Sequence, residues 1–197
     1  ARGAGKGATL TDAQIATWDI NTDWVDYFFK QSNTTSHNLS VENSSQNVAS
    51  FTSLGYLEQD GILETTGLQR FTLRNNINGK STNNKFKYQI NSSFGFSKNN
   101  EATSLGEGAI NRNYVLGAFI SAPYVTPDTY QGPRSALNYY NTTPGLLATP
   151  IMLIDKLQQY KNQTDEIRVD VASDFSYDVT KDLTFRTRLN GQYLDTR

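Results

Sequence analysis

The feature that most constrains this fold is a nearly strict alternation of apolar and polar residues in the stretch FKYQINSSFGF at 86–96. Successive side chains of a β-strand point to opposite faces, so the residues at the even positions form one face. That face is aromatic at both ends, and only Ser92 interrupts its apolar series. The opposite face is polar. The stretch therefore predicts a strand that separates two different environments.

The same alternation recurs along the chain and predicts six strands. They lie at 34–44, 48–58, 68–78, 85–97, 166–179 and 183–194. The stretch at 48–58 is apolar on both sides, so the alternation does not show which of its sides lies on the apolar face of the sheet. If the sheet belongs to a membrane barrel, its orientation toward lipid or lumen stays open. The segment 98–165 holds all five prolines, and we expect two short helices in it, at 108–120 and 149–161. In the second, Thr149 suits the N-cap and Pro150 the first helical position.

The lengths of the five connections between these strands are, in order, short, medium, short, very long and short. In an antiparallel meander every second connection lies at the same end of the sheet, so the short turns share one end. Outer-membrane barrels have short periplasmic turns and longer extracellular loops. The pattern predicts an all-β fold that is part of an antiparallel transmembrane β-barrel, with short helices in its long extracellular loops. We expect an extracellular connector at 1–33 and a partial barrel at 34–197, with an extracellular insertion at 98–165.

Composition excludes several other classes of protein. The chain has 197 residues and a net charge of −1, which gives no electrostatic reason to expect nucleic acid as a partner. It has no cysteine and a single histidine, His37. A thiolate or multi-histidine metal site and a histidine-dependent catalytic triad are therefore not expected. We expect no enzyme activity, no cofactor and no metal.

The apolar face of each strand is predicted to face membrane lipid. Its aromatic residues fall near the strand ends and flank a band of isoleucine, valine and leucine, as in the aromatic girdles of outer-membrane barrels. The residues predicted to face lipid are Phe71, Leu73, Ile77, Phe86, Tyr88, Ile90, Phe94, Phe96, Ile167, Val169, Val171, Phe175, Tyr177, Phe185, Leu189 and Tyr193.

The opposite face of the strands carries charged residues. We expect these side chains to line the barrel lumen and to pair with one another or with other protein inside the barrel. They are Arg70, Arg74, Lys87, Arg168, Asp170, Asp174, Arg186 and Arg188.

Four stretches, in this order, resemble the barrel region of the SusC/RagA family of TonB-dependent outer-membrane transporters. They are TDWVDYFFK at 22–30, HNLSV at 37–41, SLGYLEQDGIL at 53–63 and RFTLRNNIN at 70–78. APYVTPD at 122–128 and LTFRTRLNGQY at 183–193 are also similar to this family. The positions that match its usual wording are Thr22, Asp23, Trp24, Asp26, Ser53, Gly55, Tyr56, Gly61, Arg70, Arg74 and Asn76.

The resemblance implies a function in the bacterial outer membrane. It implies import of an oligosaccharide or peptide captured by a SusD-like surface lipoprotein, and it allows a dimeric complex. Energy would come from TonB acting on a plug. The plug, the TonB box and the signal of the family are not among these residues, so we expect an interior portion of a larger protein.

The segment 122–141 is rich in tyrosine and proline, which suits a contact surface. We expect it on the extracellular side, toward the lipoprotein or the substrate cavity, or else folded over the barrel rim. The tyrosines concerned are Tyr124, Tyr130, Tyr139 and Tyr140.

Two alternatives stay open at this point. One is a soluble extracellular β-sandwich that binds a ligand on its aromatic face. The other is a porin-like or adhesive outer-membrane barrel that does not couple to TonB.

Overall fold

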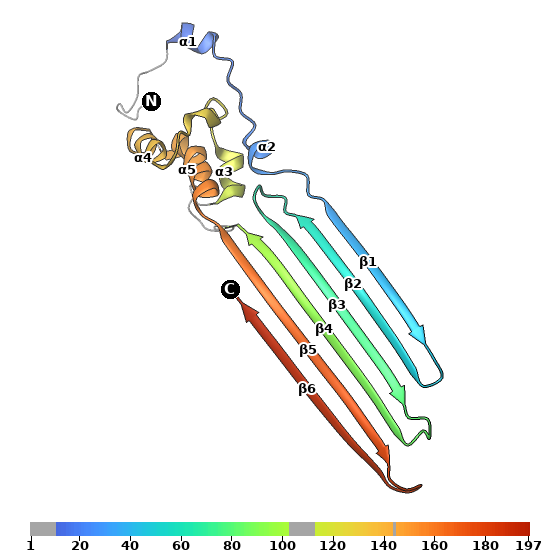
Figure 1. The fold of residues 1–197 in the computed structure, drawn as a ribbon. Coiled ribbons are helices and arrows are strands. Elements are labelled where there is room, and N and C mark those ends of the chain that lie inside the picture. Colours follow the sequence, from blue (N-terminus) through green and yellow to red (C-terminus); the bar gives the residue numbers. More distant parts are fainter. Residues whose placement is uncertain (1–10, 103–112, 144) are drawn as a thin grey trace. The chain divides into compact units, whose positions relative to one another are not determined.

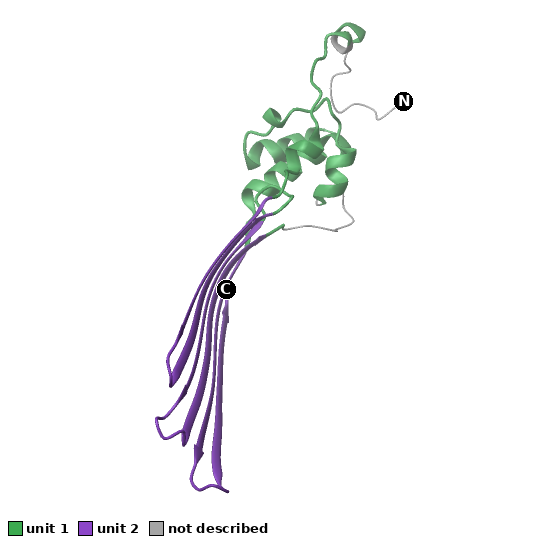
Figure 2. Ribbon diagram, turned by 90° about the vertical axis from the view of Figure 1, so that its right-hand side faces the viewer, with its two compact units in different colours: residues 1–32, 61–66, 101–162 green, residues 33–60, 67–100, 163–197 purple. Residues whose placement is uncertain are grey.

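The computed structural model describes residues 11–102, 113–143 and 145–197, and the chain divides into two compact units. Figure 2 colours them separately. Unit 1 comprises residues 1–32, 61–66 and 101–162, and unit 2 comprises residues 33–60, 67–100 and 163–197. Unit 2 is a β-sheet, and unit 1 is built mainly of helices.

Unit 2 is a single sheet whose six strands follow one another in chain order (Figure 1). The strands are β1 (Thr34–Ser44), β2 (Val48–Asp60), β3 (Gly67–Lys80), β4 (Phe86–Glu101), β5 (Asn162–Asp178) and β6 (Thr184–Thr196). Neighbouring strands are antiparallel, and the sheet is a plain meander. The predicted antiparallel all-β fold is therefore confirmed. The strands on either side of the long insertion are longer than expected, because β4 continues to Glu101 and β5 begins at Asn162.

Three short turns join strands at one end of the sheet, which we call the turn end. Backbone hydrogen bonds close them: the Ser45 amide donates to the Val48 carbonyl at 2.7 Å, and the Ser81 amide donates to the Phe86 carbonyl at 2.8 Å. In the third turn, the Val179 amide donates to the Leu183 carbonyl at 2.9 Å. At the opposite end, the chain leaves the sheet between β2 and β3 and again between β4 and β5.

The register of the strands defines two faces, which we call face A and face B. Leu54 on β2 is the Cα partner of Leu73 on β3, which in turn partners Phe94 on β4, and all three lie on face A. Stacked rings of Phe86 and Phe175 continue face A from β4 to β5. Because side chains alternate along each strand, these pairs assign every strand residue to a face. The residues predicted to face lipid all lie on face A, and the charged residues predicted to face the lumen all lie on face B.

The register also assigns the stretch 48–58, whose orientation the sequence left open. Tyr56 is the partner of Phe71 and lies on face A, whereas Leu57 is the partner of Arg70 and lies on face B. Phe51 lies on face B as well, which explains why this strand is apolar on both sides.

Unit 1 contains five α-helices and one 3₁₀ helix among its described residues. They are α1 (Asp12–Ala16), α2 (Trp24–Phe28), α3 (Tyr114–Ile120), η2 (Pro127–Thr129), α4 (Pro133–Thr142) and α5 (Gly145–Gln159). Their apolar core includes Phe28, Tyr114, Ile151 and Ile154, all almost fully buried. None of the helices in the described ranges has the length and hydropathy that crossing a membrane would require.

The helices differ from those predicted. The first expected helix begins only at Tyr114, and its proposed residues 108–112 lie outside the described part of the chain. The predicted N-cap at Thr149 is wrong, because α5 begins at Gly145 and Pro150 lies inside it. The hydroxyl of Thr149 donates to the Gly145 carbonyl one turn earlier, at 3.0 Å. Helix α4 was not predicted from the sequence.

Candidate functional site

Face A of the sheet is apolar and exposed. Leu39, Phe185, Leu189 and Tyr193 are each between 58% and 63% exposed, whereas the core side chains of unit 1 are almost completely buried. Burying apolar side chains is the main favourable contribution to folding, so an exposed face of this length indicates contact with another apolar phase or surface.

The aromatic residues of face A gather at two levels. Near the turn end, the rings of Phe86 and Phe175 stack with centroids 6.2 Å apart. Nearer the other end, Phe71 and Phe94 meet edge to face at 6.5 Å. Phe86 and Phe94 are eight positions apart on β4, which corresponds to about 27 Å along a strand. In a strand tilted by about 35–45°, this length corresponds to about 19–22 Å along the membrane normal, close to the apolar band of about 25 Å that aromatic girdles flank in outer-membrane barrels.

Face B of the sheet is polar and carries ion pairs between and along the strands. Asp170 accepts hydrogen bonds from Arg168 Nε at 2.9 Å and from the Ser93 hydroxyl at 3.2 Å. Across β5 and β6, Arg188 Nε lies 3.0 Å from an oxygen of Asp174. Predicted lumen residues therefore pair with one another at these two places.

Other charged side chains on face B do not pair within the predicted lumen set. Lys87 lies 3.4 Å from Asp178, which is outside the set of residues predicted to line the lumen. Arg70, Arg74 and Arg186 make no ion pair with any described residue. Face B thus holds paired charges on β5 and β6 and unpaired arginines mainly on β3.

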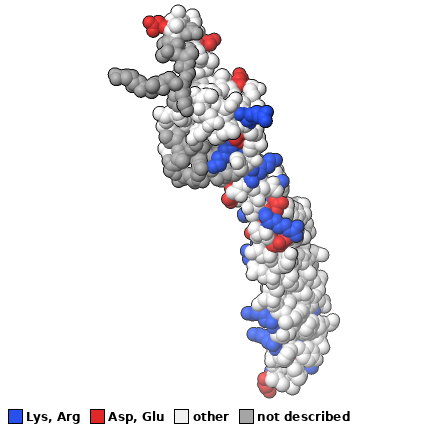
Figure 3. Space-filling model, turned by 90° about the vertical axis from the view of Figure 1, so that its left-hand side faces the viewer, with Lys and Arg blue, Asp and Glu red and all other residues white. Residues whose placement is uncertain are grey.

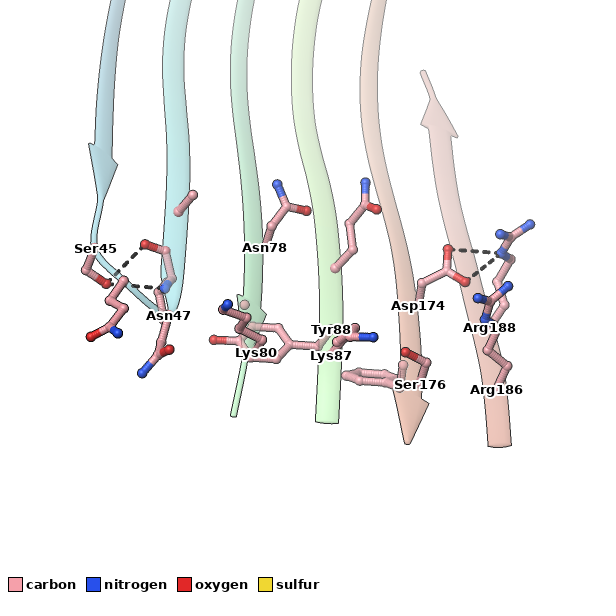
Figure 4. Close-up of a pocket in the computed structure, with 16 residues that line it drawn as sticks. Ser45, Asn47, Asn78, Lys80, Lys87, Tyr88, Asp174, Ser176, Arg186 and Arg188 are labelled. Carbon is pink, nitrogen blue, oxygen red and sulfur yellow. Dashed lines mark hydrogen bonds and ion pairs between the residues drawn. The ribbon is translucent and has the colours of Figure 1, made fainter. Parts of the chain in front are cut away.

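Shallow depressions lie mainly over face B. One of about 600 Å³ lies at the turn end, and Figure 4 shows the residues that line it, from all six strands or their turns. Another, of about 430 Å³, lies further along the strands. Its polar lining comes mainly from Arg74, Asn76, Asn91, Ser93, Asp170, Asn190 and Gln192. Both depressions offer hydrogen-bonding groups, although apolar atoms make up the larger part of their exposed lining.

In unit 1, two stretches that carry the family resemblance contact each other although they are far apart in the sequence. The indole Nε1 of Trp24 donates to the Ala122 carbonyl at 2.9 Å, and the Thr22 hydroxyl donates to the Val125 carbonyl at 2.8 Å. Between them, Asp23 caps α2 by accepting from the amides of Val25 and Asp26. The TDW stretch at 22–24 therefore holds the middle of the long insertion in place.

The loop 61–66 packs on the same unit. Leu63 is buried and bridges to Phe29, and the Lys30 amide donates to the Ile62 carbonyl at 2.7 Å. Lys30 and Glu64 add an ion pair at 3.6 Å. Unit 1 is thus assembled from three separate segments of the chain around one core.

The four tyrosines of the predicted contact surface fall into two groups. Tyr124 and Tyr140 are exposed by 48% and 45%. Tyr139 packs against the core, and the Tyr130 hydroxyl donates to Asp155 at 2.9 Å. Burial is the main cause that raises the pKa of both Tyr130 and Tyr139. Of these four tyrosines, Tyr124 and Tyr140 are therefore the two whose side chains are exposed.

The described residues show no cluster of three or more histidine, cysteine, aspartate or glutamate side chains that could hold a metal ion. His37 lies on face A beside Tyr56, its partner on β2.

Comparisons with known proteins agree with this geometry. No protein-family model matches the chain. It is 26% identical over 187 residues to the TonB-dependent receptor SusC of Bacteroides thetaiotaomicron, covering 89% of this chain and 18% of that receptor. It is 29% identical over 90 residues to a TonB-dependent receptor of Formosa agariphila, covering 45% of this chain and 9% of that protein.

The fold is also similar to solved structures. The structure of the RagAB peptide importer in the open-open state matches with a TM-score of 0.67 and 16% identity, over 94% of this chain and 21% of that one. The structure of the RagAB peptide transporter gives a TM-score of 0.67 and 18% identity, over 90% and 19%. The chain therefore spans about a fifth of the length of these proteins. The resemblance predicted from the sequence is confirmed: the chain is similar in sequence to the TonB-dependent receptor SusC and in fold to the RagAB structures.

Proposed function

We propose that unit 2 forms part of the wall of a transporter in the bacterial outer membrane, with face A toward lipid and face B toward the lumen. The observation that carries this proposal is the exposed apolar face with aromatic side chains at two levels, about 27 Å apart along β4. A soluble β-sandwich would bury such a face against a second sheet, and in this sheet its large side chains are exposed.

The edges of the sheet support the same proposal. β1 and β6 each pair with one strand only, so each carries a row of backbone groups without a partner strand in the described structure. Within a bilayer, unpaired backbone groups cost several kcal/mol each, and a closed barrel is the arrangement of strands that satisfies them. We therefore infer that β1 and β6 pair with further strands of a barrel.

The proposed activity is import of an oligosaccharide or peptide with energy from TonB. It rests on the similarity to the TonB-dependent receptor SusC and to the fold of the RagAB peptide importer. A SusD-like surface lipoprotein would capture the solute on the extracellular side, next to the exposed tyrosines of unit 1. TonB would act through a plug, and the complex would be able to dimerise.

The membrane orientation can be tested with neighbouring positions on one strand. Single cysteines at Ile90 and Asn91 of the full-length protein, each carrying a nitroxide spin label, point to opposite faces of β4. In lipid vesicles, the label at Ile90 should collide mainly with oxygen, which concentrates in lipid, and the label at Asn91 should not. Val171 and Ala172 on β5 provide a second pair. Equal access of a water-soluble nickel complex to both labels of each pair would favour the soluble alternative.

TonB coupling is tested separately by uptake in cells. Loss of uptake in a strain without TonB, with the protein still present in the outer membrane, is the expected result. Uptake that persists in this strain would favour a porin-like barrel.

A further inference from the structure

Three cations lie at the turn end of face B, and we call Lys80, Lys87 and Arg186 the basic row. Lys80 on β3 is the direct Cα partner of Lys87 on β4, and Arg186 on β6 is the partner of Ser176 on β5. Figure 4 shows these four side chains near one level of four neighbouring strands. Like charges directly opposite each other destabilise a sheet, so strand pairing does not account for the adjacent lysines.

The three cations of the basic row share one carboxylate among the described residues. Lys87 lies 3.4 Å from Asp178, Arg186 acts on the same carboxylate without forming an ion pair, and Lys80 makes no ion pair with a described residue. Asp174, which lines the same depression, is held by Arg188 at 3.0 Å. Three cations against one carboxylate leave a net positive charge of two at this end of face B.

The surroundings of the basic row suit an anionic group. The row lines the depression of about 600 Å³, whose wall adds the hydroxyl of Ser176 and the amides of Asn78 and Gln89. Figure 3 shows lysine and arginine side chains gathered on one side of the sheet near its turn end. Ammonium and guanidinium groups bind carboxylates and sulfate esters through charge-assisted hydrogen bonds, and a guanidinium can use two parallel bonds.

We propose that the basic row binds the carboxylate or sulfate group of an anionic oligosaccharide as it passes along the lumen. This proposal rests on the proposed function, because it requires face B to line the lumen. A neutral solute would leave the cations unpaired. An acidic protein surface would satisfy them permanently, so its presence is an outcome that the test must separate.

The test compares charged and neutral oligosaccharides on one protein. The purified full-length protein in detergent is titrated by calorimetry with trigalacturonate, with a sulfated κ-carrageenan tetrasaccharide and with neutral maltotriose. The double substitution Lys80→Gln and Arg186→Gln should weaken binding of at least one anionic probe tenfold or more at low salt and leave maltotriose unaffected. The probe that responds identifies carboxylate or sulfate. Lys181→Gln is the matched control, since Lys181 is an exposed cation in the turn outside the row.

Two results would overturn the proposal. Equal affinity of the double variant and the original protein for both anionic probes would remove the row as a binding site, as would the absence of binding by either protein. A lower Tm of the double variant, without any loss of anion binding, would instead assign the row to an acidic protein surface. If the spin labels at Ile90 and Asn91 still report opposite environments, the transporter wall stands although the anion site fails.

Discussion

Tyr88 lies directly opposite Gly79 across β3 and β4, and its ring covers the glycine on face A. A Cβ atom at Gly79 would overlap the ring and the hydroxyl of Tyr88. The missing side chain thus leaves room for an aromatic ring close to the turn end, where the aromatic residues of face A gather. This pairing also favours one register of β3 against β4, because a shift would place a side chain beneath the ring.

Replacing this glycine should destabilise the sheet. Gly79→Ala forces the Tyr88 ring to move, and we expect a loss of about 1–3 kcal/mol in the free energy of unfolding. Urea unfolding of the full-length protein in lipid vesicles, followed by heat-modifiable migration on a gel, measures the effect. Gly191→Ala is the matched control, because a Cβ at Gly191 meets no atom within 4 Å. Equal effects of the two substitutions would contradict the role of the ring.

A charge on face A should be far more costly than a charge on face B. Ile90→Arg should lower the free energy of unfolding by about 2–4 kcal/mol if the residue lies near the middle of the bilayer. Asn91→Arg places the same side chain on the polar face and should be tolerated. The same refolding assay compares the two, and similar losses at both positions would reject the assigned orientation.

The hydrogen bond between Trp24 and Ala122 should stabilise unit 1. Trp24→Phe keeps an aromatic ring in the core but removes the indole N–H, which should cost about 1–2 kcal/mol. Limited proteolysis of the long insertion in the membrane-bound protein measures local opening of unit 1. Trp18→Phe is the control, since Trp18 is 42% exposed while Trp24 is 2% exposed. Unchanged cleavage of the Trp24 variant would show that this bond does not hold the insertion.

The exposed tyrosines should contribute to partner binding. Tyr124→Ser and Tyr140→Ser remove contact area without touching the core, so together they should reduce co-purification of the lipoprotein severalfold. Tyr160→Ser is the control, because Tyr160 is 62% exposed in the same unit but lies outside the predicted contact surface. Unaltered co-purification would exclude these two tyrosines from the interface. Point substitutions are preferable to a deletion of 122–141, which would also remove Val125 and Ala136 from the core.

The two faces of the sheet were predictable because strand geometry imposes a period of two on the sequence. The alternation at 86–96 identifies face A on β4 without any tertiary information. It fails at 48–58, where Phe51 and Leu57 place apolar side chains on the polar face, and only pairing with β3 resolves the orientation.

Unit 1 was much less predictable because its structure depends on contacts between distant residues. The partner of Trp24 is 98 positions away, and no local pattern identifies it. Helix α4 begins at Pro133, directly after Gly132, and contributes only Ala136 to the buried core, so few large apolar residues mark it in the sequence. At α5, Pro150 suggested a helix start, but the chain continues the helix through it.

The assembly of unit 1 from three separate segments of the chain has a consequence for the order of folding. The hairpins β1–β2, β3–β4 and β5–β6 close over short loops, so their loop-closure entropy cost is low. The core of unit 1 joins Phe28 and Leu63 to Tyr114 and Ile154, so it closes only when segments far apart in the chain have come together. Its high contact order makes closure of this unit a late step, after the strands on both sides of the insertion have been extended.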